Sequence, residues 1–288
     1  MMDIFIFDVG LGQCVYFLPH DAPEYSMLVD CGHDGDFHPI DQLIEWDIVH
    51  VNEQNKREIG NLTLTNYDHD HFSGLPYLCS KVKIRTVRLA KNLTVDELLA
   101  LKDEETEALS TLIDMRNDYN QGAIAYKPPY KKSVFHLTQD ELTAAGIEPT
   151  TNHLSQVVFV ETNDVVICIP GDLEEASWEL MLNNEAVTNL LERTSIFFAS
   201  HHGRENGYHP DIFNYCFPDC IIISDKEIMH ATQEGMAGLY SPYVIGDGII
   251  LKHGSGNMRR KVLSTRKDGH VLIRINARGN TEFHALGR

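Results

Sequence analysis

Two carboxylates, an imidazole and a side-chain amide lie within six consecutive residues, at Asn66, Asp68, Asp70 and His71. Clustered oxygen and imidazole groups suit a divalent metal ion, and water bound to such an ion becomes a nucleophile near neutral pH. The apolar run at 59–65 predicts a buried strand, and a helix is expected directly after the four residues, so they would share one loop. A solvated acidic loop would show the same spacing, but ligands elsewhere in the chain favour a metal site.

Further candidate ligands share one position, because each stands at one end of a predicted strand. They are Asp8, Asp30, His153, Asp172, His201 and His202. Side chains at strand ends on one rim of a sandwich converge in space, and the sheets hold them rigid. We expect Asp8 and Asp30 to support turns or ligands rather than to bind the ion, whereas His153 is as consistent with turn packing as with metal binding. His230 is more consistent with a surface loop than with an active site.

Short apolar runs predict the elements that must position these ligands. Strands are expected at residues 4–10, 15–18, 26–32, 157–161, 165–169, 195–199 and 221–224. The close spacing of the first three indicates an antiparallel meander. A helix is expected over 94–117, with Thr94 and Glu97 as its capping box. Two β-rich halves, each followed by helices, predict a single α/β domain over 1–288, built as a four-layer αβ/βα sandwich.

Composition restricts the classes of function. The 288-residue chain carries a net charge of -18, which opposes broad electrostatic binding to nucleic acid, although a local basic patch or a bound cation can reverse the sign at a site. No apolar run approaches the roughly 20 residues that span a bilayer, and the N-terminus lacks the basic start of a signal peptide. The six cysteines lack zinc-knuckle spacing and are interpreted as reduced thiols. We therefore expect a cytoplasmic protein without membrane association.

Six short motifs occur in one order along the chain. They are Asp8-Val9-Gly10-Leu11-Gly12, Leu28-Val29-Asp30-Cys31-Gly32, Asn66-Tyr67-Asp68-His69-Asp70-His71, Asn152-His153-Leu154-Ser155, Gly171-Asp172 and His201-His202-Gly203. Together they resemble the motifs of metallo-β-lactamase fold hydrolases, and within that family those of the hydrolase domain of the competence DNA-uptake protein ComEC. The resemblance covers nearly the whole chain and implies the same four-layer sandwich. The motifs are specific for the fold and only suggestive for the substrate.

The resemblance implies a centre with two divalent metal ions. The ligands it implies for both ions together are Asn66, Asp68, Asp70, His71, His153, Asp172 and His202, with His201 as the alternative to His202. Asp70 and His71 would hold one ion, and Asp172 would bridge the pair. Asn66 and Asp68 would face the other ion. Because Asn66 stands where the family usually has histidine, the oxygen-rich pocket favours manganese or magnesium, with zinc as a further candidate.

The reaction implied is hydrolysis of a phosphodiester by metal-bound hydroxide, with DNA or RNA as the expected substrate. Asp70 and Asp172 would act at the metal centre, and His201 would protonate the leaving oxygen. In the basic segment 252–267, the residues expected to grip phosphate are Lys252, Arg259, Arg260 and Lys261. A solvated edge strand explains that segment equally well.

Two other functions remain open at this point. One is hydrolysis of a small cyclic nucleotide or ester, which the charge of -18 favours over a polymer. The other is a non-catalytic, metal-stabilised subunit with a protein partner in a multi-component system, such as a defence module. Steep salt dependence of binding would distinguish a polymer from a small ligand.

Overall fold

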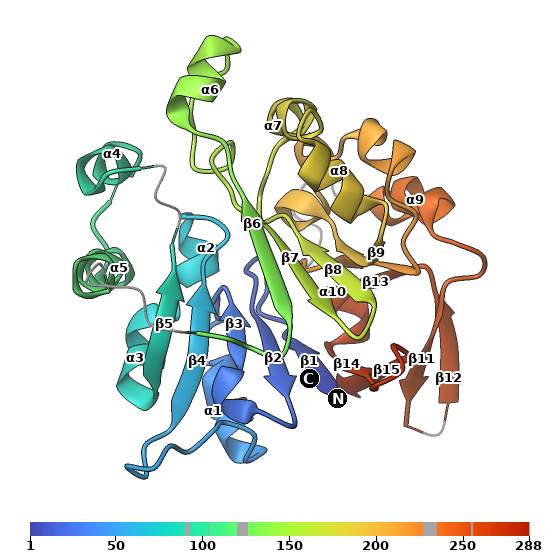
Figure 1. The fold of residues 1–288 in the computed structure, drawn as a ribbon, viewed down its shortest axis with the longest axis horizontal. Coiled ribbons are helices and arrows are strands. Elements are labelled where there is room, and N and C mark those ends of the chain that lie inside the picture. The colour runs from blue at the N-terminus through green and yellow to red at the C-terminus, as the bar shows by residue number, and fades with distance from the viewer. Residues whose placement is uncertain (90–92, 103, 120–125, 227–234, 255, 288) are drawn as a thin grey trace.

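Two β-sheets face each other, and helices lie against their outer surfaces (Figure 1). The computed structural model describes residues 1–89, 93–102, 104–119, 126–226, 235–254 and 256–287. The strands of the nine-stranded sheet are, in spatial order, β12 (Gly256–Arg260), β11 (Ile249–His253), β15 (Thr281–Gly287), β14 (His270–Ile275), β1 (Met2–Ile6), β2 (Val15–Pro19), β3 (Met27–Val29), β4 (Glu58–Thr63) and β5 (Lys83–Arg88). Those of the six-stranded sheet are β13 (Val262–Ser264), β10 (Cys220–Ile223), β9 (Thr194–Phe198), β8 (Val165–Ile169), β7 (Val157–Thr162) and β6 (Lys131–Phe135).

Alternate residues of the strands enter different cores, as expected for sheets buried on both faces. Ile4 and Ile6 of β1 belong to the core between the sheets, where they join Ile167 of β8. Phe5 points the other way, and its ring lies 5.6 Å from that of Trp46 at the end of α1 (Pro39–Glu45). The predicted α/β four-layer sandwich is confirmed.

The remaining helices are short. Along the chain, most of them connect one strand to the next. They are α2 (His69–Phe72), α3 (Leu75–Lys81), α4 (Val95–Ala100), α5 (Glu107–Asp118), α6 (Gln139–Ala144), α7 (Glu175–Met181), α8 (Glu185–Leu191), α9 (Met236–Tyr240) and α10 (Thr265–Asp268). None of the helices in the described part of the chain has the length and apolarity needed to cross a bilayer.

The predicted continuous helix over 94–117 is wrong. The chain forms α4 and then α5, because Thr106 starts a new helix by accepting a hydrogen bond from the backbone N–H of Leu109. The predicted capping box of Thr94 and Glu97 is present at the start of α4. The meander β1–β2–β3 is antiparallel as predicted, and β4 then pairs in parallel with β3.

Parallel pairing brings the ends of three strands to one rim of the sandwich. β4 runs parallel to β3 in one sheet, and β8 runs parallel to β9 in the other. The segments that leave β4, β8 and β9 carry the acidic and histidine side chains of the predicted site. In the middle of the nine-stranded sheet, β1 lies between β2 and β14, with Met2 opposite Ile275.

Candidate metal centre

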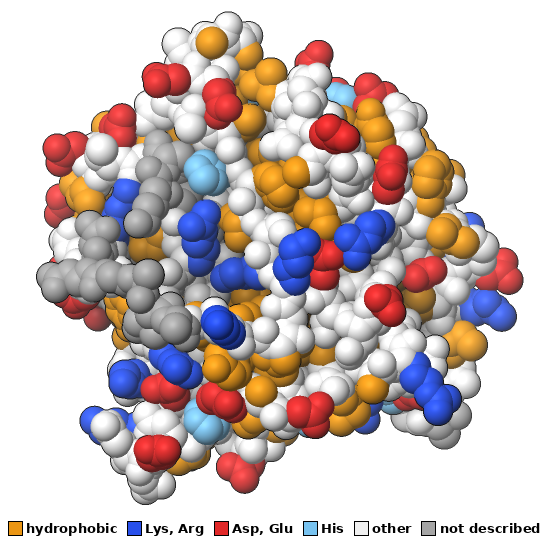
Figure 2. Space-filling view, in the orientation of Figure 1, with side chains coloured by type: hydrophobic (Ala, Val, Ile, Leu, Met, Phe, Trp, Pro, Cys, Tyr) orange, Lys and Arg blue, Asp and Glu red, His pale blue; other side chains and the backbone are white. Residues whose placement is uncertain are grey.

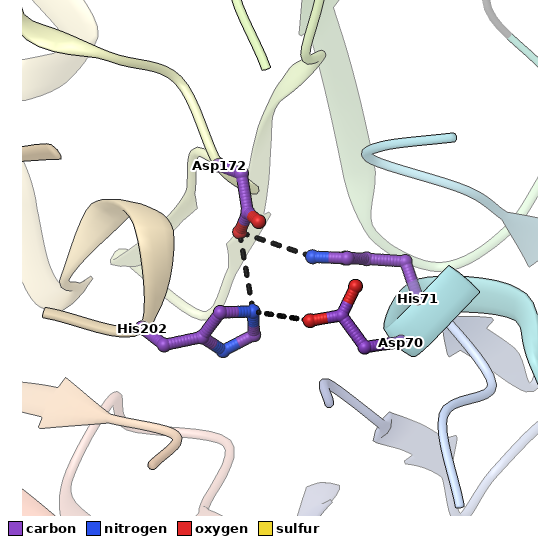
Figure 3. A group of neighbouring side chains, drawn as sticks. All are labelled: Asp70, His71, Asp172 and His202. Carbon is purple, nitrogen blue, oxygen red and sulfur yellow. Dashed lines mark ion pairs between the residues drawn. The ribbon is translucent and has the colours of Figure 1, made fainter. Parts of the chain in front are cut away.

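Four side chains from both sheets converge at this rim: Asp70, His71, Asp172 and His202 (Figure 3). Their ligand atoms all lie within 4.8 Å of one another. Asp172 Oδ1 lies 3.0 Å from His71 Nε2 and 3.3 Å from His202 Nε2. His202 Nε2 is also 3.2 Å from Asp70 Oδ2. We call these four residues the metal cluster.

The ring nitrogens on the far side of both histidines are fixed by acceptors. His71 Nδ1 lies 2.8 Å from Asp30 Oδ2, and His202 Nδ1 lies 2.9 Å from the carbonyl oxygen of Ser224. Because a carboxylate and a carbonyl only accept, both Nδ1 atoms carry the proton. Each Nε2 is therefore the nitrogen directed into the metal cluster, and it would offer its lone pair once metal binding displaces a proton, as in metal sites where an outer acceptor sets the histidine tautomer.

Asp30 organises this rim although it lies outside the metal cluster. Its carboxylate is fully buried and accepts hydrogen bonds from the backbone N–H and the hydroxyl of Thr65, and from Gln13 Nε2 at 2.8 Å. His71 is the fourth donor. Four donors on one carboxylate hold both Asp30 and the His71 ring in one orientation.

The donor set of the metal cluster fits a divalent cation. His71 Nε2, Asp172 Oδ1 and His202 Nε2 are buried, and none makes a hydrogen bond of good geometry within the described part of the chain, although they lie close to one another as ion pairs. Buried polar atoms without partners are costly, and three of them directed at one point indicate a ligand there. Two imidazoles with two carboxylates are a ligand set that zinc and manganese both accept.

The pKa values of the metal cluster show how strongly it attracts positive charge. Burial alone would raise the pKa of Asp172, but the charges of His71 and His202 hold that pKa well below its usual value. Burial opposes protonation of His71, yet Asp172 and Asp30 raise its pKa well above the usual value. A divalent cation would supply this charge in place of protons, so metal binding should release protons.

Two glycines allow two turns of the chain to pack directly against the backbone of α2, the helix that carries Asp70 and His71. A Cβ atom on Gly12 would lie 2.4 Å from the backbone oxygen of Asp70, and one on Gly32 would lie 2.3 Å from the same oxygen. No side chain tolerates such distances, so only glycine lets both turns support the first turn of α2. This contact explains the glycines in the motifs that follow β1 and β3. It also places Asp70 and His71 on a helix rather than on the predicted loop.

His201 lies at the edge of the metal cluster. Its Nε2 is 3.9 Å from Asp172 Oδ2 and accepts a hydrogen bond from Arg204, whose guanidinium can only donate. Burial lowers the pKa of His201. A neutral ring with an accepting Nε2 does not hold the proton that the expected role as an acid requires. His201 and His202 both have left-handed backbones, with φ of 51° and 54°, and this strain aims the two rings differently.

Three of the expected ligands lie outside the metal cluster. Asn66 donates to Asn152 and accepts from the backbone N–H of Asp68, and Asp68 pairs with Lys102 at 2.8 Å. His153 Nδ1 lies 2.9 Å from Ser177 Oγ. His230 lies outside the described residues.

The basic residues of segment 252–267 lie in two different places in the structure. Lys252 pairs with Glu282 at 2.9 Å, and Arg259 lies 3.6 Å from Asp247. Both lie on the hairpin β11–β12, at the edge of the nine-stranded sheet. Lys261 follows this hairpin.

By contrast, Arg260 lines a cleft that His202 also borders, together with Arg266 and Lys267. Arg260 pairs with Asp268 at 3.0 Å in this cleft. Of the residues predicted to grip phosphate, Arg260 is thus the one that shares a cleft with a member of the metal cluster.

Sequence reasoning missed several residues that contact the site. Glu174 accepts hydrogen bonds from Asn152 and Asn206 and lies 3.6 Å from His201 Nδ1. Its position two residues after Asp172 was a usable signal. Lys102 offered none, because its contact with Asp68 spans 34 residues and lies at the end of a helix that was predicted to continue.

Comparison with known proteins concerns the family and the fold. The sequence family described as the Metallo-beta-lactamase superfamily matches residues 9–207, which include the whole metal cluster. Unliganded yeast PDE1 has a TM-score of 0.52 at 14% identity, covering 94% of this chain and 99% of that chain. The metallo-beta-lactamase fold protein YhfI from Bacillus subtilis has a TM-score of 0.46 at 10% identity, covering 85% and 94%. No curated protein sequence matches the chain.

Proposed function

The chain belongs to the metallo-beta-lactamase superfamily, and on this basis we propose that it is a metal-dependent phosphodiesterase that cleaves DNA or RNA. The observation that carries the proposal is the buried group of Asp70, His71, Asp172 and His202, with its unpartnered donor atoms. Zinc or manganese would bind there, with magnesium as a third candidate. The narrower resemblance to the ComEC hydrolase domain stays a prediction based on the motifs.

The residues in and around the metal cluster have different roles in the proposed hydrolysis. A bound divalent cation lowers the pKa of a water ligand and polarises a phosphoryl oxygen. Asp70 and Asp172 keep their negative charge because neighbouring histidines lower both pKa values against the effect of burial. The neutral ring of His201 could accept a proton at Nε2 once Arg204, which donates to that atom here, releases it. Glu174 lies on the other side of that ring, 3.6 Å from Nδ1.

Local positive charge supports an anionic substrate despite the net charge of -18. Figure 2 shows Lys and Arg side chains gathered near the middle of one face, along β6. β6 contributes Lys131, whose Nζ lies 2.8 Å from Glu161 Oε1. The neighbouring Lys132 adds less positive charge, because burial together with Arg88 lowers its pKa to about 7. Beside the metal cluster, Arg260 and Lys267 line the cleft at His202. Such patches attract a polyanion locally.

A cleavage assay tests the proposal. Wild-type protein and Asp172→Ala are incubated with single-stranded DNA, duplex DNA, RNA and cyclic nucleotides in Mn²⁺, Mg²⁺ or Zn²⁺. We expect the wild type to cleave a polymer and the variant to fall to the level of buffer alone, because Asp172 contacts both histidines of the metal cluster. Circular dichroism checks that the variant is folded.

The substrates separate the remaining functions. Cleavage of cyclic nucleotides alone, with little salt dependence, would favour the small-substrate hydrolase over the nuclease. Equal cleavage by wild type and variant would reveal a contaminant and refute the assignment of the site. Metal binding without hydrolysis of any substrate would favour the non-catalytic subunit with a protein partner.

A further inference from the structure

We propose that the centre holds one divalent cation, and that the ammonium group of Lys102 takes the role of a second one at Asp68. The inference rests on the metal centre of the proposed function and goes beyond it. The sequence resemblance implies a second ion at Asn66, Asp68 and His153, and the contacts of these residues do not fit one.

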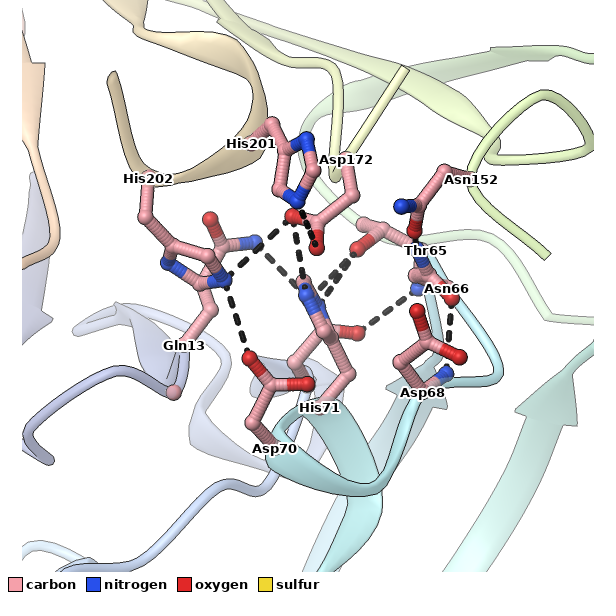
Figure 4. A network of polar contacts seen from close by, with 12 residues as sticks. Gln13, Thr65, Asn66, Asp68, Asp70, His71, Asn152, Asp172, His201 and His202 are labelled. Carbon is pink, nitrogen blue, oxygen red and sulfur yellow. Dashed lines mark hydrogen bonds and ion pairs between the residues drawn. The ribbon is translucent and has the colours of Figure 1, made fainter. Parts of the chain in front are cut away.

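The side chain of Asn66 is already committed to protein partners (Figure 4). Its oxygen accepts the backbone N–H of Asp68 at 2.7 Å, and its Nδ2 donates to Asn152 Oδ1 at 2.8 Å. The backbone N–H is a donor only, so the amide oxygen must face it. That oxygen belongs to the turn, and the neutral amide would be a weak ligand even if it were released.

Asp68 already has a cation. Lys102 Nζ lies 2.8 Å from Asp68 Oδ1, and the Thr151 hydroxyl donates to the same oxygen at 2.7 Å. The Lys102 side chain is 16% exposed, so water screens this pair less than it screens a surface pair. A divalent cation binding to Asp68 would meet an ammonium group within a few ångströms, and the repulsion would oppose it.

His153 faces another part of the site. Its Nδ1 lies 2.9 Å from Ser177 Oγ, and its Nε2 lies 3.6 Å from Glu174. Among the described residues, the four members of the metal cluster are the group of acidic, histidine and cysteine side chains with convergent ligand atoms. The structure therefore offers ligands for one ion and a fixed positive charge beside it. Unlike a metal ion, that charge does not depend on metal supply.

Counting bound metal tests the inference without using activity. Wild type, Lys102→Met, Lys102→Arg and Asp172→Ala are dialysed against excess Zn²⁺ or Mn²⁺, freed of unbound metal and measured by inductively coupled plasma mass spectrometry. We expect one ion per chain in the wild type and in Lys102→Arg, which keeps the charge. Lys102→Met frees Asp68 and should take up a second, more weakly held ion in a calorimetric titration. Asp172→Ala should retain none.

Two outcomes would overturn the inference: two tightly bound ions in the wild type, or a calorimetric titration of folded Lys102→Met that shows no second, weaker site. Because the count needs no substrate, its failure is distinct from failure of the proposed function. A wild type that holds one ion and cleaves nothing contradicts only the phosphodiesterase, whereas a wild type that holds two ions and cleaves DNA contradicts only the role of Lys102.

Discussion

Replacing Asp30 with asparagine should weaken metal binding by roughly 10–100-fold, although Asp30 is not a ligand. The carboxylate orients His71 and accepts three further hydrogen bonds, from Thr65 and Gln13. Asparagine has the same shape and tolerates the left-handed backbone of this position, where φ is 57°. Its amide cannot accept all four donors, so the His71 ring loses its fixed tautomer. Competition with a chromogenic chelator measures the change in affinity.

A matched control separates this effect from general damage. Asp3 is also a buried carboxylate, paired with Arg274 and His20, and lies near the start of β1, away from the turn that carries Gly12. Asp3→Asn should lower the melting temperature without changing metal affinity. If Asp30→Asn binds metal as tightly as the wild type, Asp30 does not orient His71 as we infer.

Adding one methyl group at Gly32 should both destabilise the fold and weaken the metal site. The Cβ of Gly32→Ala would lie 2.3 Å from the backbone oxygen of Asp70 and 3.1 Å from the backbone of Gln13. Backbone atoms must move to relieve this clash, at a cost of about 1–3 kcal/mol. The movement would shift Asp70 and His71 together, because both lie on α2. Thermal unfolding with and without metal measures both effects.

Gly238→Ala is the control for this substitution. Gly238 lies on α9, and a Cβ there would have no atom within 4 Å. Alanine in a helix is favoured over glycine, so this variant should be as stable as the wild type or slightly more stable. Equal melting temperatures for the two alanine variants would show that the turn at Gly32 can relax, contrary to our interpretation.

The sequence predicted the elements whose residues are mostly apolar. β1, β2, β7, β8, β9 and β10 lie within the expected runs or within a residue or two of them, because strands buried on both faces have few polar positions to blur the pattern. β5 reads Lys-Ile-Arg-Thr-Val-Arg and is a half-exposed edge strand, so its pattern was too weak to recognise. The break between α4 and α5 lacks glycine and proline among its described residues, and only the cap at Thr106 marks it.

The candidate site was predictable where ligands stand next to strand ends. Asp172 and His202 follow β8 and β9, and Asp70 and His71 follow β4, and the structure brings these four side chains together; their role as metal ligands stays a prediction. The sequence does not show which of His201 and His202 points into the metal cluster. Both residues have left-handed backbones, so their side chains do not alternate in direction as they would on a strand. The partners of Asp68 and His153 were equally hidden, since they come from distant segments.

The pairing of β1 with β14 has a consequence for how a nascent chain assembles. β1 is made before the other described strands, but its second neighbour covers residues 270–275, so one edge of β1 stays open until β14 has been made. An open apolar edge invites pairing with other chains, and a chaperone would find its target there. All four members of the metal cluster precede residue 203, so they leave the ribosome before β14 does. Binding of the ion and completion of the nine-stranded sheet are therefore separable events. A chain that has bound its ion can still lack the pairing of β1 with β14.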